Sequence, residues 1–387
     1  MGSFKTLSIV IPAYNEEEAI EDILKKCLEA RQPLRQALGL SQVEIVLVDD
    51  GSRDATSRKA AAFPEVKLVS HAVNKGYGRA LMTGFEAASG EVLGFLDADG
   101  TCDPMAFIDL GRALDGGADM AVGNRIHAAS QMPRLRTLGN VFYAYVISLL
   151  SGVQVNDAAS GMRLFRRALL ERLSPLPAGL HFTPAMSARA ACMGASISET
   201  PIPYAVRQGE SKLNVVGDGI RFLRVILGII FAYYPLRIFG PLAVIFGLAA
   251  LGYGLGPVLF YWKHGHLEED MIYRLLTILT LAVCALIMGA FGLIAQRISD
   301  IAVGRSRGWL DSKSLRGAGV AAGMSLGLGG VLLNSRTILE YVSSGRISIH
   351  WVYVLVGGLS VISGAVLVAF GITLGLASHL PDQLKKR

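Results

Sequence analysis

The chain has 387 residues, of which 52% are apolar and 18% charged, with a formal net charge of +6. This length is sufficient for two structural units. The soluble part has no basic stripe with interleaved aromatic residues, which argues against a nucleic-acid partner. The four cysteines are scattered without a CxxC pair, which argues against a structural zinc site or a disulfide framework and fits a reducing, cytosolic setting.

Composition divides the chain into two parts. Up to about Val215, short apolar runs alternate with charged stretches, whereas beyond Ile220 long apolar segments are separated by short polar loops. The basic excess near these segments fits both positive-inside orientation and attraction to anionic lipid. We expect a cytoplasmic domain at residues 1–215, an interfacial helix at 216–235, a transmembrane domain at 236–380 and a basic cytoplasmic tail at 381–387.

The soluble part contains five short apolar runs separated by amphipathic segments. Between the runs, as at residues 16–29 and 77–88, apolar residues recur at the three- and four-residue spacing of helices. This alternation predicts βαβ units, and therefore an α/β fold with a mostly parallel sheet. The first run is too short for a signal peptide. The expected strands are residues 7–11, 44–48, 66–69, 92–96 and 120–122.

Polar and acidic residues follow three of these strands. In open parallel sheets, ligands bind outside the carboxyl ends of the strands. One Asp-Gly pair is usually only a turn, but three clusters at one edge predict a binding site. The clusters are Pro12-Ala13-Tyr14-Asn15-Glu16, Asp49-Asp50-Gly51-Ser52 and Asp97-Ala98-Asp99.

Asp97 and Asp99 are two residues apart at a strand end, where both carboxylates can reach one hard cation. Such oxygens suit Mg²⁺ or Mn²⁺, which often hold a substrate diphosphate through one or two carboxylates and waters. The alternative is a capped loop before a helix near Pro104, with Asp103 as its N-cap.

The three clusters are accompanied by further motifs in a familiar order. Together they resemble the family 2 glycosyltransferases with the A-type fold, specifically the dolichyl-phosphate mannose synthase-like branch, over roughly residues 5–235. The resemblance implies inverting transfer of one sugar from a GDP- or UDP-linked donor to dolichyl or undecaprenyl phosphate. The further motifs are Asn74-Lys75-Gly76, Gly123-Asn124-Arg125, Asp157 with Ser160-Gly161-Met162-Arg163, and Arg207-Gln208-Gly209-Glu210-Ser211-Lys212-Leu213.

The resemblance implies a role for each matching residue. The nucleotide-sugar would be bound by Pro12, Tyr14, Glu16, Asp49, Asp50, Lys75, Gly76, Asp97 and Asp99. Mg²⁺ or Mn²⁺ would be held by Asp97 and Asp99. The acceptor phosphate and the leaving diphosphate would be bound by Arg125, Arg136, Ser160, Arg163, Arg207 and Lys212. The residues expected to take part in catalysis are Asp99, Asp157 and Arg163.

Two points of the chemistry stay open at this level. Thr101 stands where many relatives carry a glutamine that is a candidate metal ligand, so water or the Thr101 hydroxyl would replace it. Asp157 is either a general base or a residue that orients the acceptor and balances the arginines. A phosphomonoester acceptor has a second pKa of about 6, so it needs a base less than a sugar hydroxyl does.

The second part of the chain predicts a multi-pass membrane protein of the cell membrane, or of the endoplasmic reticulum membrane in a eukaryote. Basic residues concentrate after the second span and in the tail, whereas the loop before the second span carries Glu268-Glu269-Asp270. Both termini are therefore expected in the cytoplasm. The basic residues are Arg297, Arg305, Arg307, Lys313, Arg316, Lys385, Lys386 and Arg387. The expected spans are residues 236–262, 273–296, 317–336 and 351–376.

Two features of this part concern packing. Residues 220–234 predict a helix lying on the membrane, because Arg221 and Arg224 share one side and Pro235 favours a break before the first span. The alternative is a helix that simply continues into the span. Gly319, Gly323 and Gly327 recur at four-residue spacing, which permits close helix packing either within one chain or in a homo-oligomer.

Two rival functions remain to be weighed. A processive polysaccharide synthase would carry a Gln-x-x-Arg-Trp motif, but the only tryptophans are Trp262, Trp309 and Trp351. A transporter or membrane scaffold with a vestigial catalytic domain would have lost the Asp-x-Asp pair, and both carboxylates are present.

Overall fold

The computed structural model describes residues 3–127, 130–209, 212, 214–305, 309–310, 312–347 and 351–384. The chain forms two compact units, Met1–Ile230 and Phe231–Arg387. The boundary lies inside one helix, α8 (Val215–Tyr233). The finer division at residues 215 and 235 stays a prediction.

The first unit is built on a seven-stranded sheet of order β3-β2-β1-β4-β6-β5-β7. All neighbouring strands are parallel except β6, which is antiparallel to β4 and to β5. The mostly parallel α/β sheet expected from the sequence is therefore confirmed. The strands are β1 (Thr6–Ala13), β2 (Gln42–Asp49), β3 (Lys67–Ser70), β4 (Val92–Phe95), β5 (Met120–Asn124), β6 (Arg163–Arg166) and β7 (Ile197–Pro201).

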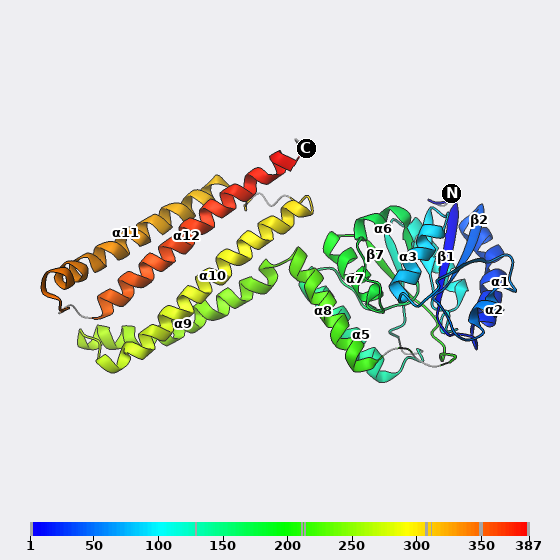
Figure 1. Ribbon diagram of the computed structural model, residues 1–387, viewed down its shortest axis with the longest axis horizontal. Helices are drawn as coiled ribbons and strands as arrows, with labels where there is room; N and C mark the ends of the chain where they lie inside the picture. The colour runs from blue at the N-terminus through cyan, green and yellow to red at the C-terminus, as the bar shows by residue number, and fades with distance from the viewer. Residues whose placement is uncertain are drawn as a thin grey trace. The chain divides into compact units, whose positions relative to one another are not determined.

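Helices cover both faces of this sheet (Figure 1). Ile9 and Ile11 of β1 pack on one face, with side chains of α1 and α4, whereas Val10 packs on the other, with α3 and α7. Because successive side chains of a strand point to opposite faces, a strand buried on both sides has no polar alternation. The helices of this unit are α1 (Ile20–Leu38), α2 (Thr56–Ala60), α3 (Tyr77–Ala87), η1 (Pro104–Ala106), α4 (Phe107–Asp115), α5 (Arg134–Ser151), α6 (Arg167–Leu173), α7 (Phe182–Met193) and α8.

Two local predictions are confirmed at the edge of the sheet. β1, β2 and β4 end at Ala13, Asp49 and Phe95, so the three acidic clusters follow neighbouring strands. The side chain of Asp103 accepts a hydrogen bond from Met105 N and caps η1, with Pro104 at its first position.

Within the described residues of the second unit, four helices are long and apolar enough to cross a membrane. The four predicted spans lie within these helices. α8 ends at Tyr233 and the next helix begins at Leu236, so the helical structure is interrupted next to Pro235 as expected. The helices are α9 (Leu236–His264), η2 (Glu269–Met271), α10 (Ile272–Ala302), α11 (Lys313–Ser344) and α12 (Trp351–Leu384).

Glycines bring α11 and α12 together within this unit. A Cβ at Gly323 would lie 2.6 Å from the carbonyl oxygen of Gly364, and one at Gly319 would lie 3.3 Å from the Phe370 ring. At Gly327 the corresponding space is open. Packing inside one chain therefore uses Gly319 and Gly323 of the predicted glycine series.

Candidate active site

A cavity of about 510 Å³ opens at the carboxyl edge of the strands in the first unit. Of the residues to which the sequence assigned a binding or catalytic role, eleven line it: Pro12, Tyr14, Glu16, Asp50, Gly76, Asp97, Asp99, Arg125, Arg136, Arg207 and Lys212. The structure thus brings residues from far-separated motifs to one site. Asp49, Lys75, Asp157, Ser160 and Arg163 do not contribute to its wall.

Asp50 is held rigidly in the wall of the cavity. Its Oδ1 is hydrogen-bonded to Nδ1 of His71 at 2.7 Å and accepts from the backbone N–H of Lys75, while Oδ2 accepts from the N–H of Gly76. Thr83 holds the other ring nitrogen of His71 at 3.0 Å. Lys75 therefore contributes its backbone rather than its side chain. Asp49 closes its own turn by accepting from Ser52 N.

Asp97 and Asp99 have different surroundings. Asp97 Oδ1 accepts a 2.7 Å hydrogen bond from the hydroxyl of Tyr77, and any Cβ at Gly161 would overlap its Oδ2. Asp99 Oδ1 accepts from the hydroxyl and N–H of Thr101. Desolvation raises the pKa of Asp97 to about 7, and the neighbouring charge of Asp99 adds to this increase.

Arg207 links two acidic residues of the cavity. Its Nη1 donates to Asp99 Oδ2 at 2.9 Å and its Nη2 to Glu16 Oε1. Five residues along the chain, Lys212 Nζ donates to the backbone oxygen of Asn15. Desolvation raises the pKa of Glu16 against the opposing attraction of Arg207. Arg207 therefore lies with the carboxylates expected to face the donor.

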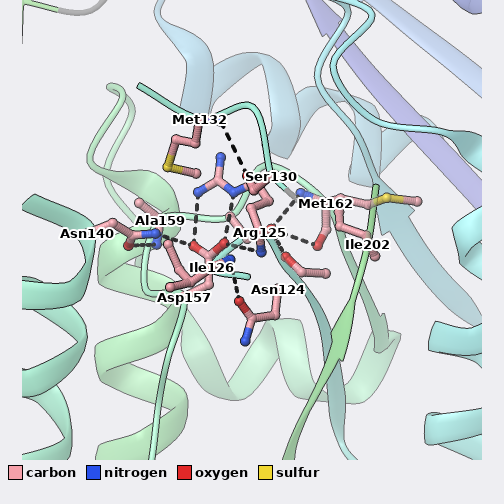
Figure 2. Close-up of polar contacts among 12 residues, drawn as sticks. Asn124, Arg125, Ile126, Ser130, Met132, Asn140, Asp157, Ala159, Met162 and Ile202 are labelled. Carbon is pink, nitrogen blue, oxygen red and sulfur yellow. Dashed lines mark hydrogen bonds and ion pairs between the residues drawn. The ribbon is translucent and has the colours of Figure 1, made fainter. Parts of the chain in front are cut away.

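Arg125 is held by a bidentate ion pair with Asp157 (Figure 2). Its Nε and Nη2 donate to the two carboxylate oxygens at 2.8 and 2.9 Å, and its backbone N–H donates to Oδ2. Its guanidinium lies 5.4 Å from the centre of the Tyr204 ring. Burial alone would raise the pKa of Asp157, but Arg125 and the hydrogen bonds hold this pKa below its usual value.

Three of the expected residues have partners inside the protein. Asp157 is fully buried and paired with Arg125, which favours the alternative in which it balances the arginines. Ser160 donates its hydroxyl to the carbonyl of Gly123. Arg163 opens β6 and is completely buried, donating to the carbonyls of Ser160 and Ala158. It supports the wall from behind.

Several residues of the site were missed by the sequence reasoning. Tyr77 is hydrogen-bonded to Asp97, and His71 to Asp50, in each case across 20 or more residues of the chain. Asn140 lines the cavity from α5. Tyr77 follows the Asn74-Lys75-Gly76 motif directly, which was the available signal. His71 and Asn140 had none, because their partners are defined only by the fold.

A family model described as glycosyl transferase family 2 matches residues 8–174. The chain is also 35% identical over 230 residues to a dolichyl-phosphate hexose transferase of Haloferax volcanii, covering 56% of this chain and 90% of that protein. The chain belongs to glycosyl transferase family 2. It is a glycosyltransferase, and the resemblance drawn from its motifs is confirmed.

Two further relatives are sugar transferases by name, and one of the names includes undecaprenyl phosphate. An undecaprenyl-phosphate 4-deoxy-4-formamido-L-arabinose transferase of Pseudomonas fluorescens is 31% identical over 64% of this chain and 75% of that protein. A low-salt glycan biosynthesis hexosyltransferase of Haloferax volcanii is 33% identical over 64% of this chain but 61% of that protein. Among solved structures, glucosyl-3-phosphoglycerate synthase of Mycobacterium tuberculosis, crystallised with Mn²⁺ and UDP, aligns with a TM-score of 0.46 at 21% identity, covering 58% of this chain and 78% of that chain.

The donor atoms of this family 2 site fit a divalent cation that keeps part of its water shell. Among the described residues, no three His, Cys, Asp or Glu side chains converge as a complete protein cage. Asp97 and Asp99 supply two carboxylates at the cavity wall, which is the number that Mg²⁺ commonly takes from protein when it also binds phosphate oxygens. The Thr101 hydroxyl donates to Asp99, so its first role is to orient that carboxylate.

Proposed function

We propose that this glycosyltransferase moves one sugar from a nucleotide-sugar to the phosphate of a polyprenyl lipid, with inversion at the anomeric carbon. The observation that carries the proposal is a cavity whose lining combines carboxylates, arginines and apolar side chains. Relatives named as dolichyl- and undecaprenyl-phosphate transferases support the same acceptor class.

The part of the cavity lined by carboxylates would take the donor. Asp50 and the backbone around Gly76 offer fixed polar groups to the nucleoside. Asp97 and Asp99 would hold Mg²⁺ or Mn²⁺, which neutralises the diphosphate when bound. Arg207 lies beside Asp99, and its Nε is buried with no hydrogen-bond partner among the described atoms. Arg207 is therefore suited to bind the leaving diphosphate.

Two arginines of the cavity lining would take the acceptor phosphate. Arg125 and Arg136 both line the cavity, and Arg125 is held in one orientation by Asp157. An acceptor oxygen forms a bond to the anomeric carbon while the bond from that carbon to the diphosphate breaks, and the nucleoside diphosphate leaves with the electron pair. Because the acceptor is largely a dianion at neutral pH, no protein base is required, in agreement with the buried ion pair of Asp157.

The apolar side chains of the cavity would take the lipid. They are Met132, Leu135, Tyr143, Leu180 and Phe222, from α5, α8 and adjoining loops. α5 also carries an exposed apolar stripe at helical spacing, formed by Leu135, Leu138, Phe142, Tyr145 and Leu149. α8 carries a second, formed by Val216, Ile220, Leu227 and Phe231.

We propose that both stripes lie in the cytoplasmic interface of the membrane. The two helices are joined by a hydrogen bond from the Tyr143 hydroxyl to the carbonyl of Gly219, and they run side by side (Figure 1). α8 leads through Pro235 into α9, which is apolar enough to span the bilayer. Exposed apolar stripes next to a span are typical of interfacial helices.

The test is a transfer assay with the full chain in lipid nanodiscs. Undecaprenyl or dolichyl phosphate is supplied with a panel of GDP- and UDP-sugars and Mg²⁺ or Mn²⁺, and lipid products are measured by mass spectrometry. We expect one hexose to be added to the lipid phosphate with at least one donor. A polymer on the acceptor would indicate a processive synthase, and the absence of any lipid product would overturn the proposal.

A further inference from the structure

The carboxylate that orients Arg125 is itself oriented by a buried amide (Figure 2). Asn140, on α5, donates from Nδ2 to Asp157 Oδ1 at 2.7 Å, the same oxygen that accepts from Arg125 Nη2 at 2.9 Å. Its own carbonyl accepts from the backbone N–H of Ala159 at 3.0 Å. Asn140 is only 4% exposed, so the amide is fixed at both ends in a place with little water.

These contacts determine the plane of the Asp157 carboxylate. The carboxylate can rotate about its last side-chain bond, and a bidentate arginine rotates with it because its two donors must face the two oxygens. The Asn140 amide prevents this rotation from one side. Glu199 fixes the backbone at this point by accepting from the N–H groups of Asn156 and Asp157.

We propose that Asn140 is a positioning residue, which holds Arg125 in register with the acceptor phosphate by acting through Asp157. This inference rests on the proposed function, since it takes Arg125 as a ligand of that phosphate. It assigns to Asn140 a role in the binding of the lipid phosphate and no direct part in donor binding.

The position of Asn140 on α5 gives the inference a second consequence. One turn earlier on α5, Arg136 lines the cavity. One turn later, the Tyr143 hydroxyl donates a hydrogen bond to the carbonyl of Gly219 on α8. The same helix exposes the apolar stripe from Leu135 to Leu149. The helix that carries the exposed apolar stripe therefore also carries Asn140, the side chain through which the position of α5 affects the Arg125 guanidinium.

The test compares Asn140→Leu with the wild-type chain in nanodiscs, using polyprenyl phosphate and the active nucleotide-sugar. We expect the KM for polyprenyl phosphate to rise about tenfold, the scale for one hydrogen bond to a charged group. The KM for the donor, and the Kd of the nucleoside diphosphate by calorimetry, should change less than about twofold. If Asn140→Leu does not fold, Asn140→Ser is measured in the same way, because a short hydroxyl cannot bridge Asp157 and Ala159 together.

A matched control separates positioning from stability. Ser148 is on the same helix and donates its hydroxyl to the carbonyls of Ala144 and Val155, away from Arg125. Ser148→Ala should lower the Tm without changing the KM for polyprenyl phosphate. In the background of Arg125→Lys, which has no fork to align, Asn140→Leu should add less than about a twofold effect.

Each outcome bears on a defined claim. A variant at position 140 that lowers the Tm like Ser148→Ala but leaves the acceptor KM unchanged would overturn the inference alone. Equal losses from Asn140→Leu with and without Arg125 would also overturn it, because the residue would not act through that arginine. If the wild-type chain makes no polyprenyl product, the proposed function fails, and this inference fails with it.

Discussion

Asp97 and Asp99 are chemically identical, but the structure gives them different partners. Asp97 is bonded to the Tyr77 hydroxyl, whereas Asp99 is paired with Arg207 and oriented by Thr101. The Asp97 pKa of about 7 shows the cost of placing two carboxylates together with little water. A divalent cation would remove this repulsion, which is the physical reason to expect metal dependence.

The first prediction concerns this pair. Asp99→Asn should lower kcat by at least about 10²-fold, the scale for losing one group that stabilises developing charge, while the far-UV circular dichroism stays unchanged. EDTA should have the same effect on the wild-type chain, and Mn²⁺ or Mg²⁺ should restore activity. Asp103→Asn is the matched control, because its exposed carboxylate only caps η1 and asparagine caps equally well. Full activity in EDTA would refute the metal assignment.

Arg207 illustrates what the sequence could not supply at this scale. Its motif indicated a ligand of the acceptor phosphate or of the leaving diphosphate, and the sequence did not separate the two. The structure pairs it with Glu16, 191 positions earlier, and such a contact is invisible to any local pattern. Ser211 and Leu213 of the same motif, with Glu210, lie outside the described residues.

The second prediction follows from this pairing. Arg207→Ala should weaken binding of the nucleoside diphosphate by about 10- to 100-fold, the range for hydrogen bonds to a charged group, measured by calorimetry. Arg136→Ala should instead raise the KM for polyprenyl phosphate and leave nucleotide binding nearly unchanged. Arg207→Lys should recover only part of the loss, because lysine lacks the planar fork. The reverse pattern in the two alanine variants would return Arg207 to the acceptor site.

At the scale of elements, hydrophobic periodicity predicted most of the sheet and its ligand-binding edge. Five strands and the turns after three of them were expected, because buried parallel strands appear as short apolar runs. β6 was not expected, since its four residues begin and end with arginine. Arg163 is buried with two carbonyl acceptors, Ser160 and Ala158, from the segment that directly precedes the strand. Tertiary contacts, rather than local propensity, determine that strand.

α5 was also missed, although its sequence contains a clear signal. Apolar residues at 135, 138, 142, 145 and 149 have the spacing of one helix face. A soluble domain would normally bury such a face, but here its leucines are 61–68% exposed. Its significance emerges only when exposure is known, because the same spacing is typical of a helix that packs on a core.

The third prediction tests the membrane contact of this face. A fluorophore on Leu138→Cys, in a chain whose Cys284 is replaced by alanine, should be strongly quenched by brominated lipids in liposomes. The three other cysteines are buried and should not react. The matched control is Arg58→Cys on α2, an exposed position that we expect to face water. Equal quenching at positions 58 and 138 would refute an interfacial α5.

At the scale of the whole molecule, the predicted membrane orientation depends on the basic residues near the ends of the spans. Of the basic residues expected after the second span, Arg297 is 5% exposed, so it contributes to packing of α10 more than to the loop. Arg305 lies 5.0 Å from the centre of the Tyr234 ring at the start of the same unit. Arg307, Lys385, Lys386 and Arg387 lie outside the described residues. Among the described residues, Arg305 in the loop after α10, and Lys313 and Arg316 in the first turn of α11, therefore remain as the basic residues on which the orientation depends.

The last prediction is that this loop, the catalytic unit and the C-terminus all lie in the cytoplasm. Four spans return the chain to its starting side, and lysine or arginine in short loops favours the cytoplasmic side. In the chain lacking Cys284, a membrane-impermeant thiol reagent applied to intact cells should label Gly265→Cys, between α9 and α10, but not Ser312→Cys, before α11. Ser312→Cys should react only after the membrane is permeabilised, and a C-terminal reporter should give a cytoplasmic signal. A reporter on the outer or luminal side would mean that the number of spans is odd, and that one of the four long helices does not cross the bilayer.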